Sequence, residues 1–334
     1  MKQAVICFDR KEHAELQTQE LSLEPAAGQV LVKSDFDLIS AGTELANYRD
    51  LPNCGGSFPR YPGYSVSGHV VKVGDGVETL KDGDNVVIPW SGHRSWFVKD
   101  AEKLYKVPSG VSQQVAAFAH LASFPFLGVR KLNLQMGESA MVAGLGLLGM
   151  LAVQYARLAG ACPVLACDFS PERRDLALRL GADYVLDPGD PDFLAKVMEL
   201  TEGNGVDGVV EVTGAFAALK QALKYVACQG RITLLGCTRV SGQGIDYYQD
   251  IHRHGVSIIG AHTMTRPHCE SRPGQWTEFD DYRTFFRYVK TGRIQVEPII
   301  HRVVSPRDAT EVYAELASLP DPPCGVLFDW RDVE

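Results

Sequence analysis

A glycine-rich turn between two apolar runs constrains the fold of this chain more than any other feature. Residues 141–168, MVAGLGLLGMLAVQYARLAGACPVLACD, contain the spacing Gly144-x-Gly146-x-x-Gly149, then an amphipathic helical pattern and a second apolar run ending at Asp168. The first glycine permits a tight turn out of a strand, the second lets the backbone approach a pyrophosphate, and the third lets helix and strand pack closely. The helix N-terminus adds free N–H groups and the positive end of a dipole. The pattern predicts a dinucleotide-binding βαβ unit.

The acidic residue that closes the second run indicates which dinucleotide binds. Asp168 stands about 20 positions past the glycines, where a carboxylate accepts hydrogen bonds from the adenosine ribose hydroxyls and repels a 2′-phosphate. This position favours NAD over NADP. Arg173 and Arg174 follow closely and are suited to hold such a phosphate, so NADP stays open as the alternative.

The hydrophobic pattern divides the chain near residue 116. Up to about residue 107, short apolar or alternating runs lie between Gly, Asp and Pro, which predicts an antiparallel, β-rich domain. From about residue 116 to residue 261, helical patterns alternate with short β-branched runs, which requires βαβ crossovers and a parallel sheet of about six strands. The remaining tail is too short for its own core. We therefore expect an α/β fold with a β-rich substrate domain, residues 1–119 and 262–334, and a Rossmann domain, residues 120–261.

Composition and charge exclude several classes of function. The 334 residues carry a net charge of -8 and have a pI near 5.6, which argues against non-specific binding to nucleic acid or to an anionic membrane. No apolar run approaches the length that crosses a bilayer. The opening MKQAVICFDRKEH lacks the apolar core of a signal peptide, so we expect a cytoplasmic protein. The eight cysteines show no metal-binding spacing and are expected to be reduced.

Six segments, taken in order, resemble the medium-chain dehydrogenase/reductase superfamily, of the alcohol and polyol dehydrogenase type. They are GTEL from residue 42, PGYSVSGHVVKVGDGVETLKDGDNVV, GLGLLG, DFSPERRDLALRLGADYVLD, GVDGVVEVTG and GRITLLG. The resemblance implies a GroES-like first domain, a nicotinamide cofactor, and a homodimer or homotetramer that pairs Rossmann sheets edge to edge. It also implies cofactor contacts beyond the glycines and Asp168, at Leu147, Leu148, Phe169, Arg173, Thr213, Gly214, Gly236 and Cys237.

The resemblance breaks at the metal ligands. Zinc-dependent members hold a catalytic metal with a Cys-Gly-Thr/Ser-Asp segment, a Gly-His-Glu segment and a third residue just before the Rossmann domain. Here residues 41–44 read AGTE, residues 63–65 read GYS, and only His120, near the third position, is able to ligate zinc. One imidazole does not make the three-ligand site that catalytic zinc needs, and the cysteine-rich lobe that holds structural zinc in relatives is also missing. The comparison implies a zinc-independent branch.

Without a metal, hydrogen-bond donors or an acid/base group must stabilise the reacting oxygen. Thr43 matches the family hydroxyl that relays the substrate proton, and Tyr64 and Ser65 stand at vacated ligand positions. His120 is the expected acid/base, since its unperturbed pKa of about 6.5 lies near the working pH. His93, in WSGHRSWF, is a second candidate. The alternatives are a core residue for His120, a solvated loop for His93, and fillers of the former metal cavity for Tyr64 and Ser65.

The side chains expected near the substrate combine aromatic faces with hydrogen-bonding heads. Such a mixture suits a hydroxylated, sugar-like or polyol substrate, because aromatic rings pack on C–H faces while polar groups bind hydroxyls. The predicted substrate residues are Glu44, Tyr48, Trp90, Trp96, Phe124 and His262. The alternative is that the aromatic residues pack against one another or form a subunit interface, and that Glu44 only anchors its loop.

The leading hypothesis is a zinc-independent, NAD(H)-dependent oxidoreductase that interconverts a secondary alcohol and a ketone. Its partner is a small hydroxylated or carbonyl compound. One rival is a reductase of activated C=C bonds, as in the quinone reductase branch, and a role like that of bacteriochlorophyllide dehydrogenase is a variant within the family. The rival from another class is a non-catalytic dinucleotide-binding protein whose lost zinc ligands mark lost chemistry.

Overall fold

The computed structural model describes residues 2–20, 22, 24–240, 242 and 244–333, and the chain divides into two compact units. Unit 1 comprises Met1–Leu121 and Tyr282–Glu334, and unit 2 comprises Ala122–Asp281. Within the described residues, no helix is both long and apolar enough to span a membrane.

Unit 2 contains a six-stranded parallel sheet in the order β10-β9-β8-β11-β12-β13, which confirms the predicted Rossmann architecture. The strands are β8 (Ala140–Ala143), β9 (Val164–Cys167), β10 (Tyr184–Leu186), β11 (Val206–Glu211), β12 (Val226–Leu234) and β13 (Ser257–Gly260). Every residue of β8 and β9 is buried. Such continuous apolar runs are typical of parallel strands covered on both faces.

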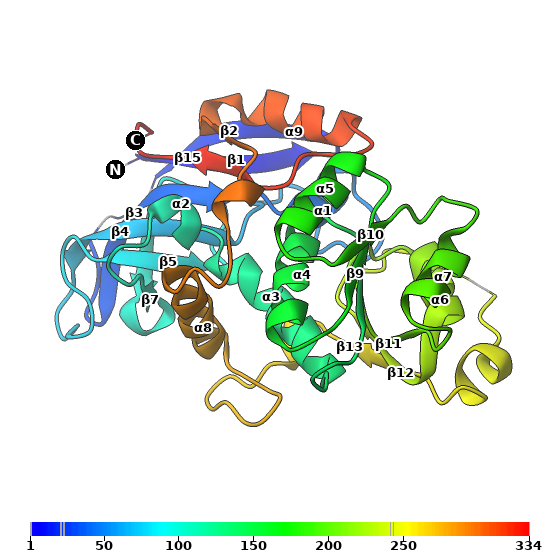
Figure 1. Cartoon of the computed structure of the whole chain (residues 1–334). Coiled ribbons are helices and arrows are strands. Elements are labelled where there is room, and N and C mark those ends of the chain that lie inside the picture. Colours follow the sequence, from blue (N-terminus) through cyan, green and yellow to red (C-terminus); the bar gives the residue numbers. More distant parts are fainter. Residues whose placement is uncertain (1, 21, 23, 241, 243, 334) are drawn as a thin grey trace. The chain divides into compact units, whose positions relative to one another are not determined.

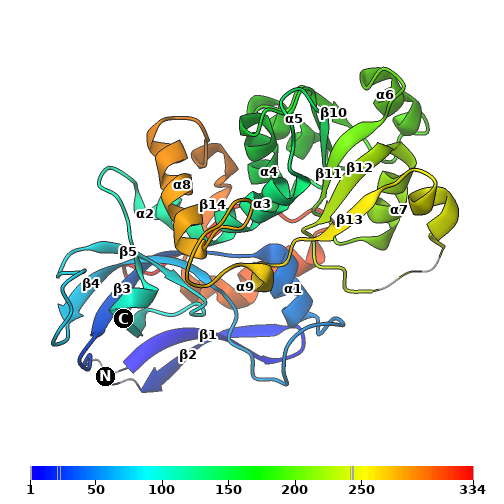
Figure 2. The same cartoon turned by 90° about the horizontal axis from the view of Figure 1, so that it is seen from below.

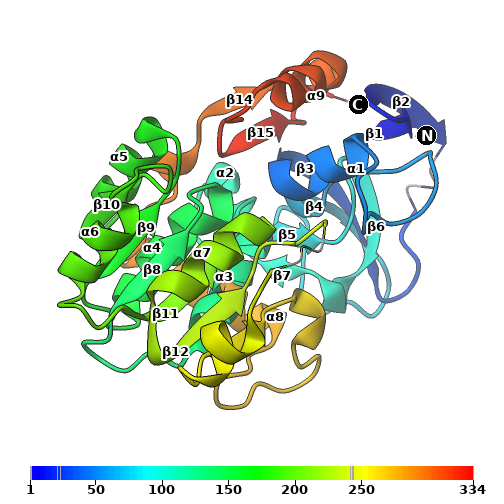
Figure 3. The same ribbon diagram turned by 90° about the vertical axis from the view of Figure 1, so that its right-hand side faces the viewer.

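Helices cover both faces of this sheet. They are α3 (Ala119–Leu132), α4 (Leu147–Leu158), α5 (Pro171–Arg179), α6 (Phe193–Leu200) and α7 (Phe216–Tyr225), followed by a π-helix at Tyr247–His252 and a 3₁₀ turn at Thr263–Thr265. Figures 1 and 3 show α4 and α5 on one face and α6 and α7 on the other. The glycine motif lies in the loop that follows the carboxyl end of β8, one of the two central strands of the sheet.

The segment 262–281 belongs to unit 2, whereas we predicted from the sequence that it joins the β-rich domain. Arg266 explains the difference. Its buried guanidinium donates to the Ser123 hydroxyl (2.9 Å) and to the Ser123 carbonyl, and lies 3.6 Å from Asp281. Arg130 pairs with the same Asp281 and lies 4.2 Å over the ring of Trp276. These contacts tie the loop to α3.

Unit 1 is built on a seven-stranded sheet in the order β14-β15-β3-β4-β5-β7, with β6 also paired to β3. Its strands are β3 (Gln29–Leu38), β4 (Ser65–Val73), β5 (Asn85–Pro89), β6 (Trp96–Asp100), β7 (Tyr105–Lys106), β14 (Arg302–Val304) and β15 (Val326–Asp329). A separate antiparallel ribbon, visible in Figure 2, consists of β1 (Lys2–Arg10) and β2 (His13–Glu20). The strand-and-turn pattern of the first hundred residues correctly predicted this β-rich unit.

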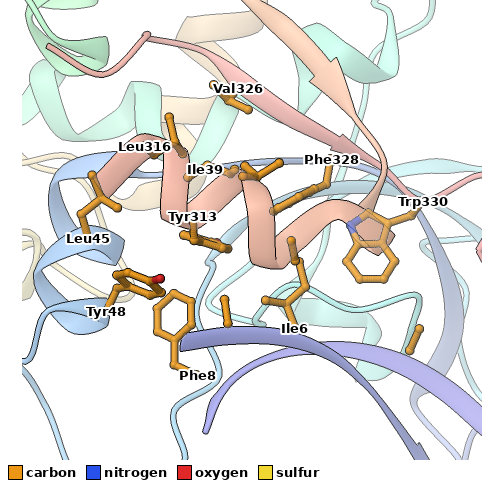
Figure 4. Close-up of a cluster of buried hydrophobic side chains, with 14 of the residues drawn as sticks. Ile6, Phe8, Ile39, Leu45, Tyr48, Tyr313, Leu316, Val326, Phe328 and Trp330 are labelled. Atoms are coloured by element: carbon orange, nitrogen blue, oxygen red, sulfur yellow. The ribbon is translucent and has the colours of Figure 1, made fainter. Parts of the chain in front are cut away.

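The chain's last strand is part of this sheet, because β15 pairs antiparallel with β3. The helices of the unit are α1 (Ala41–Tyr48), α2 (Gln113–Ala116), α8 (Glu278–Lys290) and α9 (Ala309–Ser318), with 3₁₀ turns at Ala101–Lys103, Glu297–Ile299 and Pro306–Asp308. Figure 4 shows the core between α1, α9, β1 and β15, where Tyr313 lies among Phe8, Tyr48 and Phe328. Its ring centroid is 4.8 Å from that of Phe8. This core fixes α1, which carries Thr43.

Candidate active site

The glycine motif of unit 2 forms a tightly packed turn that leaves one backbone face open. Gly144 has a φ of +96°, and a Cβ there would lie 2.7 Å from Cγ2 of Thr213. A Cβ at Gly149 would lie 2.0 Å from the carbonyl oxygen of Gly144. A Cβ at Gly146 would have no atom of the described residues within 4 Å beyond its own chain neighbours. Two of the glycines are therefore required for packing, and the third borders open space of the kind a pyrophosphate requires.

Gly146 is also the N-cap of α4, and no side chain of the described residues caps this helix. The N–H groups of its first turn, including those of Leu147 and Leu148, lack intrahelical acceptors by the geometry of an α-helix. These N–H groups lie at the positive end of the helix dipole, which favours the binding of anions. The turn therefore fits a dinucleotide pyrophosphate.

The carboxylate of Asp168 is held beside this turn by two backbone donors. Its Oδ2 accepts the N–H of Leu145 at 2.7 Å and its Oδ1 accepts the N–H of Ser170 at 3.0 Å. Arg173 lies 3.7 Å away, while Arg174 donates at 2.7 Å to the carbonyl of Asp168. The carboxylate thus has a fixed orientation suited to ribose hydroxyls. Of the two arginines, Arg173 is the nearer candidate for a 2′-phosphate.

The ends of β11 and β12 form a second backbone edge. The buried carboxylate of Glu211 accepts the N–H groups of Thr213 (2.7 Å) and Gly214 (3.1 Å), and burial raises its pKa. Gly214 has a φ of +66°, and a Cβ there would lie 2.5 Å from the Cys237 carbonyl oxygen. A Cβ at Gly236 would lie 2.3 Å from the Gly214 nitrogen. Only glycines allow these loops to approach so closely. Phe169, at the tip of the β9 loop, is 73% exposed.

A polar–aromatic cluster in unit 1 collects several predicted catalytic residues. Nδ1 of His120, at the start of α3, lies 2.7 Å from the hydroxyl oxygen of Tyr282 on α8, and both side chains are fully buried. The rings of Trp90 and Tyr64 lie edge-on to His120, with centroids 4.5 Å and 5.7 Å away. Trp90 stacks on Tyr64 and is 56% exposed, with a φ of +55°. These four residues are called the His120 cluster below.

Tyr64 connects this cluster to the segment that carries Thr43. The Tyr64 hydroxyl donates to Ser40 Oγ at 2.5 Å, and Ser40 is the N-cap of α1. Thr43 lies in the first turn of that helix and is half-buried. Tyr64 and Thr43 are thus tied to the same helix start.

The residues at the former metal positions do not fit a zinc ion. Ala41 has no donor atom, and the Ser65 hydroxyl donates to the Ala117 carbonyl at 2.6 Å while accepting the N–H of Leu121. Over the described ranges, no group of three His, Cys, Asp or Glu side chains is placed to hold a metal. The Tyr64 and Ser65 hydroxyls and Nδ1 of His120 are used in hydrogen bonds within the protein.

Ser65 is accordingly misplaced for the catalytic role we predicted. Its two hydrogen bonds tie β4 to the segment that leads into α3, and the side chain is fully buried. It is a structural residue.

His93 and Glu44 also differ from their predicted roles. Both are buried and face each other, with His93 Nε2 2.9 Å from Glu44 Oε2, so neither lies on a substrate surface. Nδ1 of His93 lies 2.8 Å from Asp37 Oδ2, as a close ion pair whose N–H is bent away from hydrogen-bond geometry. Burial opposes the charged imidazole, but the charges of Asp37 and Glu44 prevail and raise the pKa of His93 to about 10.

Besides Glu44, four predicted substrate residues are not part of the His120 cluster. Tyr48 is a core residue whose hydroxyl donates to the Glu12 carbonyl at 2.7 Å. Trp96 lies on β6 under the Lys33 ammonium. In unit 2, Phe124 lies under the Arg266 guanidinium, and His262 Nδ1 accepts the Met264 N–H to cap a 3₁₀ turn. Their aromatic character alone did not distinguish packing from binding.

Tyr282 and Ser40 are the site residues that sequence reasoning missed. Tyr282 stands 162 positions from His120, inside the amphipathic pattern DDYRTFFRYVK that reads as an ordinary surface helix. A tyrosine on the buried face of such a helix was the available signal, but nothing in the pattern indicates its partner.

Two segments of the chain match known dehydrogenase domain families. Residues 27–130 match the alcohol dehydrogenase GroES-like domain, and residues 148–278 match the zinc-binding dehydrogenase domain. L-threonine 3-dehydrogenase of Pyrococcus abyssi is 29% identical over 310 residues, covering 83% of this chain and 84% of its own. D-guloside 3-dehydrogenase of Escherichia coli is 29% identical over 255 residues, 76% of this chain and 72% of its own.

The chain belongs to the medium-chain dehydrogenase/reductase superfamily. Solved structures of similar fold include an Escherichia coli oxidoreductase/dehydrogenase of unknown specificity, with a TM-score of 0.85 at 19% identity over 98% of this chain and 99% of the other. A zinc-binding dehydrogenase of Sinorhizobium meliloti bound to NADP has a TM-score of 0.83, at 20% identity with the same coverage. An alcohol dehydrogenase of Escherichia coli complexed with NADH has a TM-score of 0.82, at 18% identity with the same coverage. Within the superfamily, the reaction class of this protein is NAD(P)-dependent oxidoreduction at an alcohol carbon.

Proposed function

We propose that this protein is a zinc-independent, NAD(H)-preferring dehydrogenase that interconverts a secondary alcohol and a ketone on a hydroxylated, sugar-like substrate. The observation that carries the proposal is the His120–Tyr282 pair, 2.7 Å apart and buried, at the place where the superfamily puts a metal ligand. A histidine paired with a phenol supplies acid–base chemistry that does not require a Lewis acid.

The dinucleotide would lie on the Gly144–Gly149 turn, with Asp168 at its ribose and the backbone edges of Gly214 and Gly236 beside it. When bound, its nicotinamide takes up the hydride of the alcohol carbon or returns it. The open face at Gly146 and the two backbone bonds that orient Asp168 support this assignment. The carboxylate supports NAD over NADP, because it repels a 2′-phosphate.

The proton follows a separate path through unit 1. With Nδ1 of His120 donating to the Tyr282 oxygen, Nε2 accepts the hydroxyl proton during oxidation of the alcohol. In the reverse direction the imidazolium returns that proton to the carbonyl oxygen. Thr43 and the Tyr64 hydroxyl are the proposed hydrogen-bond partners of the same oxygen.

Trp90 supports a hydroxylated substrate with apolar C–H faces. Its indole is 56% exposed, stacks on Tyr64 with centroids 5.5 Å apart, and packs against His120. Because it covers His120, the proposal requires the indole to move when the substrate enters. D-Guloside and threonine, which the relatives named above oxidise, both carry a secondary alcohol, and this supports the substrate class.

Turnover with a panel of polyols, sugars, amino alcohols and enones, with NAD and NADP, tests the proposal. We expect oxidation of a secondary alcohol that survives strong chelators, and loss of at least 100-fold in kcat in His120→Asn with unchanged NADH binding, about the size of an acid–base contribution. Activity abolished by chelation would refute zinc independence. Turnover confined to enones would favour a C=C reductase, and NADH binding without any turnover would favour a non-catalytic protein.

We also propose that the subunits form a homodimer through β13. This strand ends the parallel sheet, and Ser257 and Ile258 on it are exposed. An unpaired strand edge is a template for a second copy. Light scattering should show a dimer, and Ile258→Lys should shift it toward monomer; a wild-type monomer at micromolar concentration contradicts this assignment.

A further inference from the structure

His93 contacts two neighbouring segments of unit 1 that lie 49 or more positions away in the sequence. Its ring lies between Asp37, near the end of β3, and Glu44, in the first turn of α1, at 2.8 Å and 2.9 Å. All three side chains are buried, and the ring of Phe328 lies 5.4 Å from the imidazole. We call His93, Asp37 and Glu44 the buried clamp.

Three groups from outside the clamp donate hydrogen bonds to its carboxylates. The Tyr313 hydroxyl on α9 donates to Glu44 Oε2 at 2.5 Å, and the Ser40 N–H donates to Glu44 Oε1 at 2.8 Å. The Trp330 indole donates to Asp37 Oδ2 at 2.7 Å. Burial raises the pKa of Asp37, with the His93 charge opposing that shift, while the two carboxylates hold the imidazole protonated. The clamp is therefore an imidazolium between two acceptors, and no further charged side chain of the described residues pairs with it.

The clamp contacts both segments that carry proposed catalytic groups. Glu44 follows Thr43 directly on α1, and the Ser40 that it holds accepts the Tyr64 hydroxyl. On the other side, a Cβ at Gly63 would lie 2.6 Å from three ring atoms of His93, so the turn that leads into Tyr64 rests on the imidazole.

Backbone bonds complete this second contact. The His93 N–H donates to the Pro62 carbonyl at 2.8 Å, and the Gly92 N–H donates to the Gly63 carbonyl at 3.1 Å. The 91–93 loop and the 62–64 turn are thus joined. A displacement of the imidazole moves the start of α1 and this turn relative to each other.

We infer that His93 is a positioning residue of the proposed reaction, a buried imidazolium that sets the placement of Thr43 and Tyr64 through Glu44 and Gly63. The inference rests on the proposed function, because it assigns His93 to the geometry of that active site. Buried ion pairs add little net stability compared with apolar packing, and their best-supported use is to specify one arrangement. A 1 Å displacement of reacting groups lowers a rate by about 100-fold.

His93→Gln and Glu44→Gln test this role, with His69→Gln as the matched control. His69 lies on β4, with Nδ1 3.1 Å from both carboxylate oxygens of Asp35, and touches neither Thr43 nor Tyr64. Glu44→Gln leaves one imidazolium with one carboxylate, so it is the variant expected to fold if His93→Gln does not. We expect kcat to fall about 10-fold or more in both clamp variants, with KM and the NADH Kd within about twofold, and no change in His69→Gln.

A second readout separates positioning from general stability. The alkaline limb of kcat should move to lower pH in Glu44→Gln, because one of the two charges that keep His93 protonated is gone. A folded clamp variant with wild-type kcat and an unshifted limb overturns the inference and leaves the proposed function intact.

Nuclear magnetic resonance of ¹⁵N-histidine-labelled protein tests the clamp without any turnover. We expect the His93 imidazole to remain doubly protonated up to about pH 9 in the wild type. If the protein oxidises no alcohol, the proposed function fails, and the same spectra still decide the clamp. An imidazole that titrates near its ordinary pKa overturns the inference whatever the activity.

Discussion

Replacing Asp168 with asparagine tests the proposed preference for NAD(H) at the group that should decide it. The side chain is 12% exposed and accepts the N–H groups of Leu145 and Ser170. Asparagine retains one oxygen, so one of these bonds survives and the loop conformation should be largely kept. The substitution therefore removes mainly the charge.

The magnitude follows from two opposing changes. A charged acceptor for the ribose hydroxyls is worth about 1.5–3 kcal/mol to NADH, and its loss weakens binding accordingly. Two like charges about 4 Å apart repel by about 1 kcal/mol in water and by about 4 kcal/mol near a protein surface, so NADPH gains on this scale. Arg173, 3.7 Å from the carboxylate, is placed to pair with the 2′-phosphate. Since each 1.4 kcal/mol is tenfold, we expect the NADH/NADPH affinity ratio to fall about 100-fold.

Fluorescence titration with NADH and NADPH at constant salt measures both dissociation constants. Asp187→Asn is the control, because this substitution also removes one carboxylate charge from a loop at the end of a strand. Asp187 follows β10, the neighbour of β9, and pairs with Arg174 at 3.2 Å. A ratio in Asp168→Asn within about threefold of wild type would refute the reasoning. So would a wild-type protein that already prefers NADPH.

Three further substitutions address the turn, the acid–base pair and the clamp. Tyr282→Phe deletes the hydroxyl at 2.7 Å from His120 and should lower kcat about 10-fold and the unfolding free energy by about 1 kcal/mol; unchanged kinetics contradict the pair. Gly149→Ala places a Cβ 2.0 Å from the Gly144 carbonyl oxygen and should raise the NADH Kd at least tenfold without altering kcat at saturation, as titration will show. The His93 pKa is about 10 against 6.5 for a free imidazole, so its stabilisation is complete below pH 6.5 and is lost as pH rises toward 10. Urea unfolding between about pH 7 and 9.5 should therefore show a larger loss of stability in wild type than in His93→Gln, and parallel curves contradict it.

The parts of the fold that sequence patterns predicted are those set by local spacing. Gly144, Gly146 and Gly149 act within one turn, and the buried strands β8 and β9 read as short apolar runs because helices cover both faces. The β-rich character of the first hundred residues follows from the same kind of local signal. Each of these features involves residues within about one supersecondary unit.

The parts that were mispredicted depend on contacts between distant segments. In WSGHRSWF nothing shows that the carboxylates of Asp37 and Glu44 meet His93, 49 or more positions away. The sequence around Tyr48 indicates an aromatic side chain in a loop. In the structure Tyr48 is buried, because Phe8 and side chains of α9 pack against it. The 262–281 loop was assigned to the wrong unit because the anchoring of Arg266 at Ser123 spans 143 positions.

A catalytic site that lacks a metal places a different demand on the residues around it. Three ligands on zinc are mutually positioned by the coordination geometry of the ion itself. Hydrogen-bonding groups have no such common centre, so each must be held by its own neighbours, within about 0.5 Å of the productive geometry. In this chain His120 is hydrogen-bonded to Tyr282, and the Tyr64 hydroxyl to Ser40. The Ser40 backbone is in turn bound by Glu44, whose carboxylate contacts the imidazole of His93. If the proposed chemistry is right, substitutions in these supporting residues should lower kcat nearly as much as substitutions in the groups they hold, while dinucleotide affinity in unit 2 stays constant.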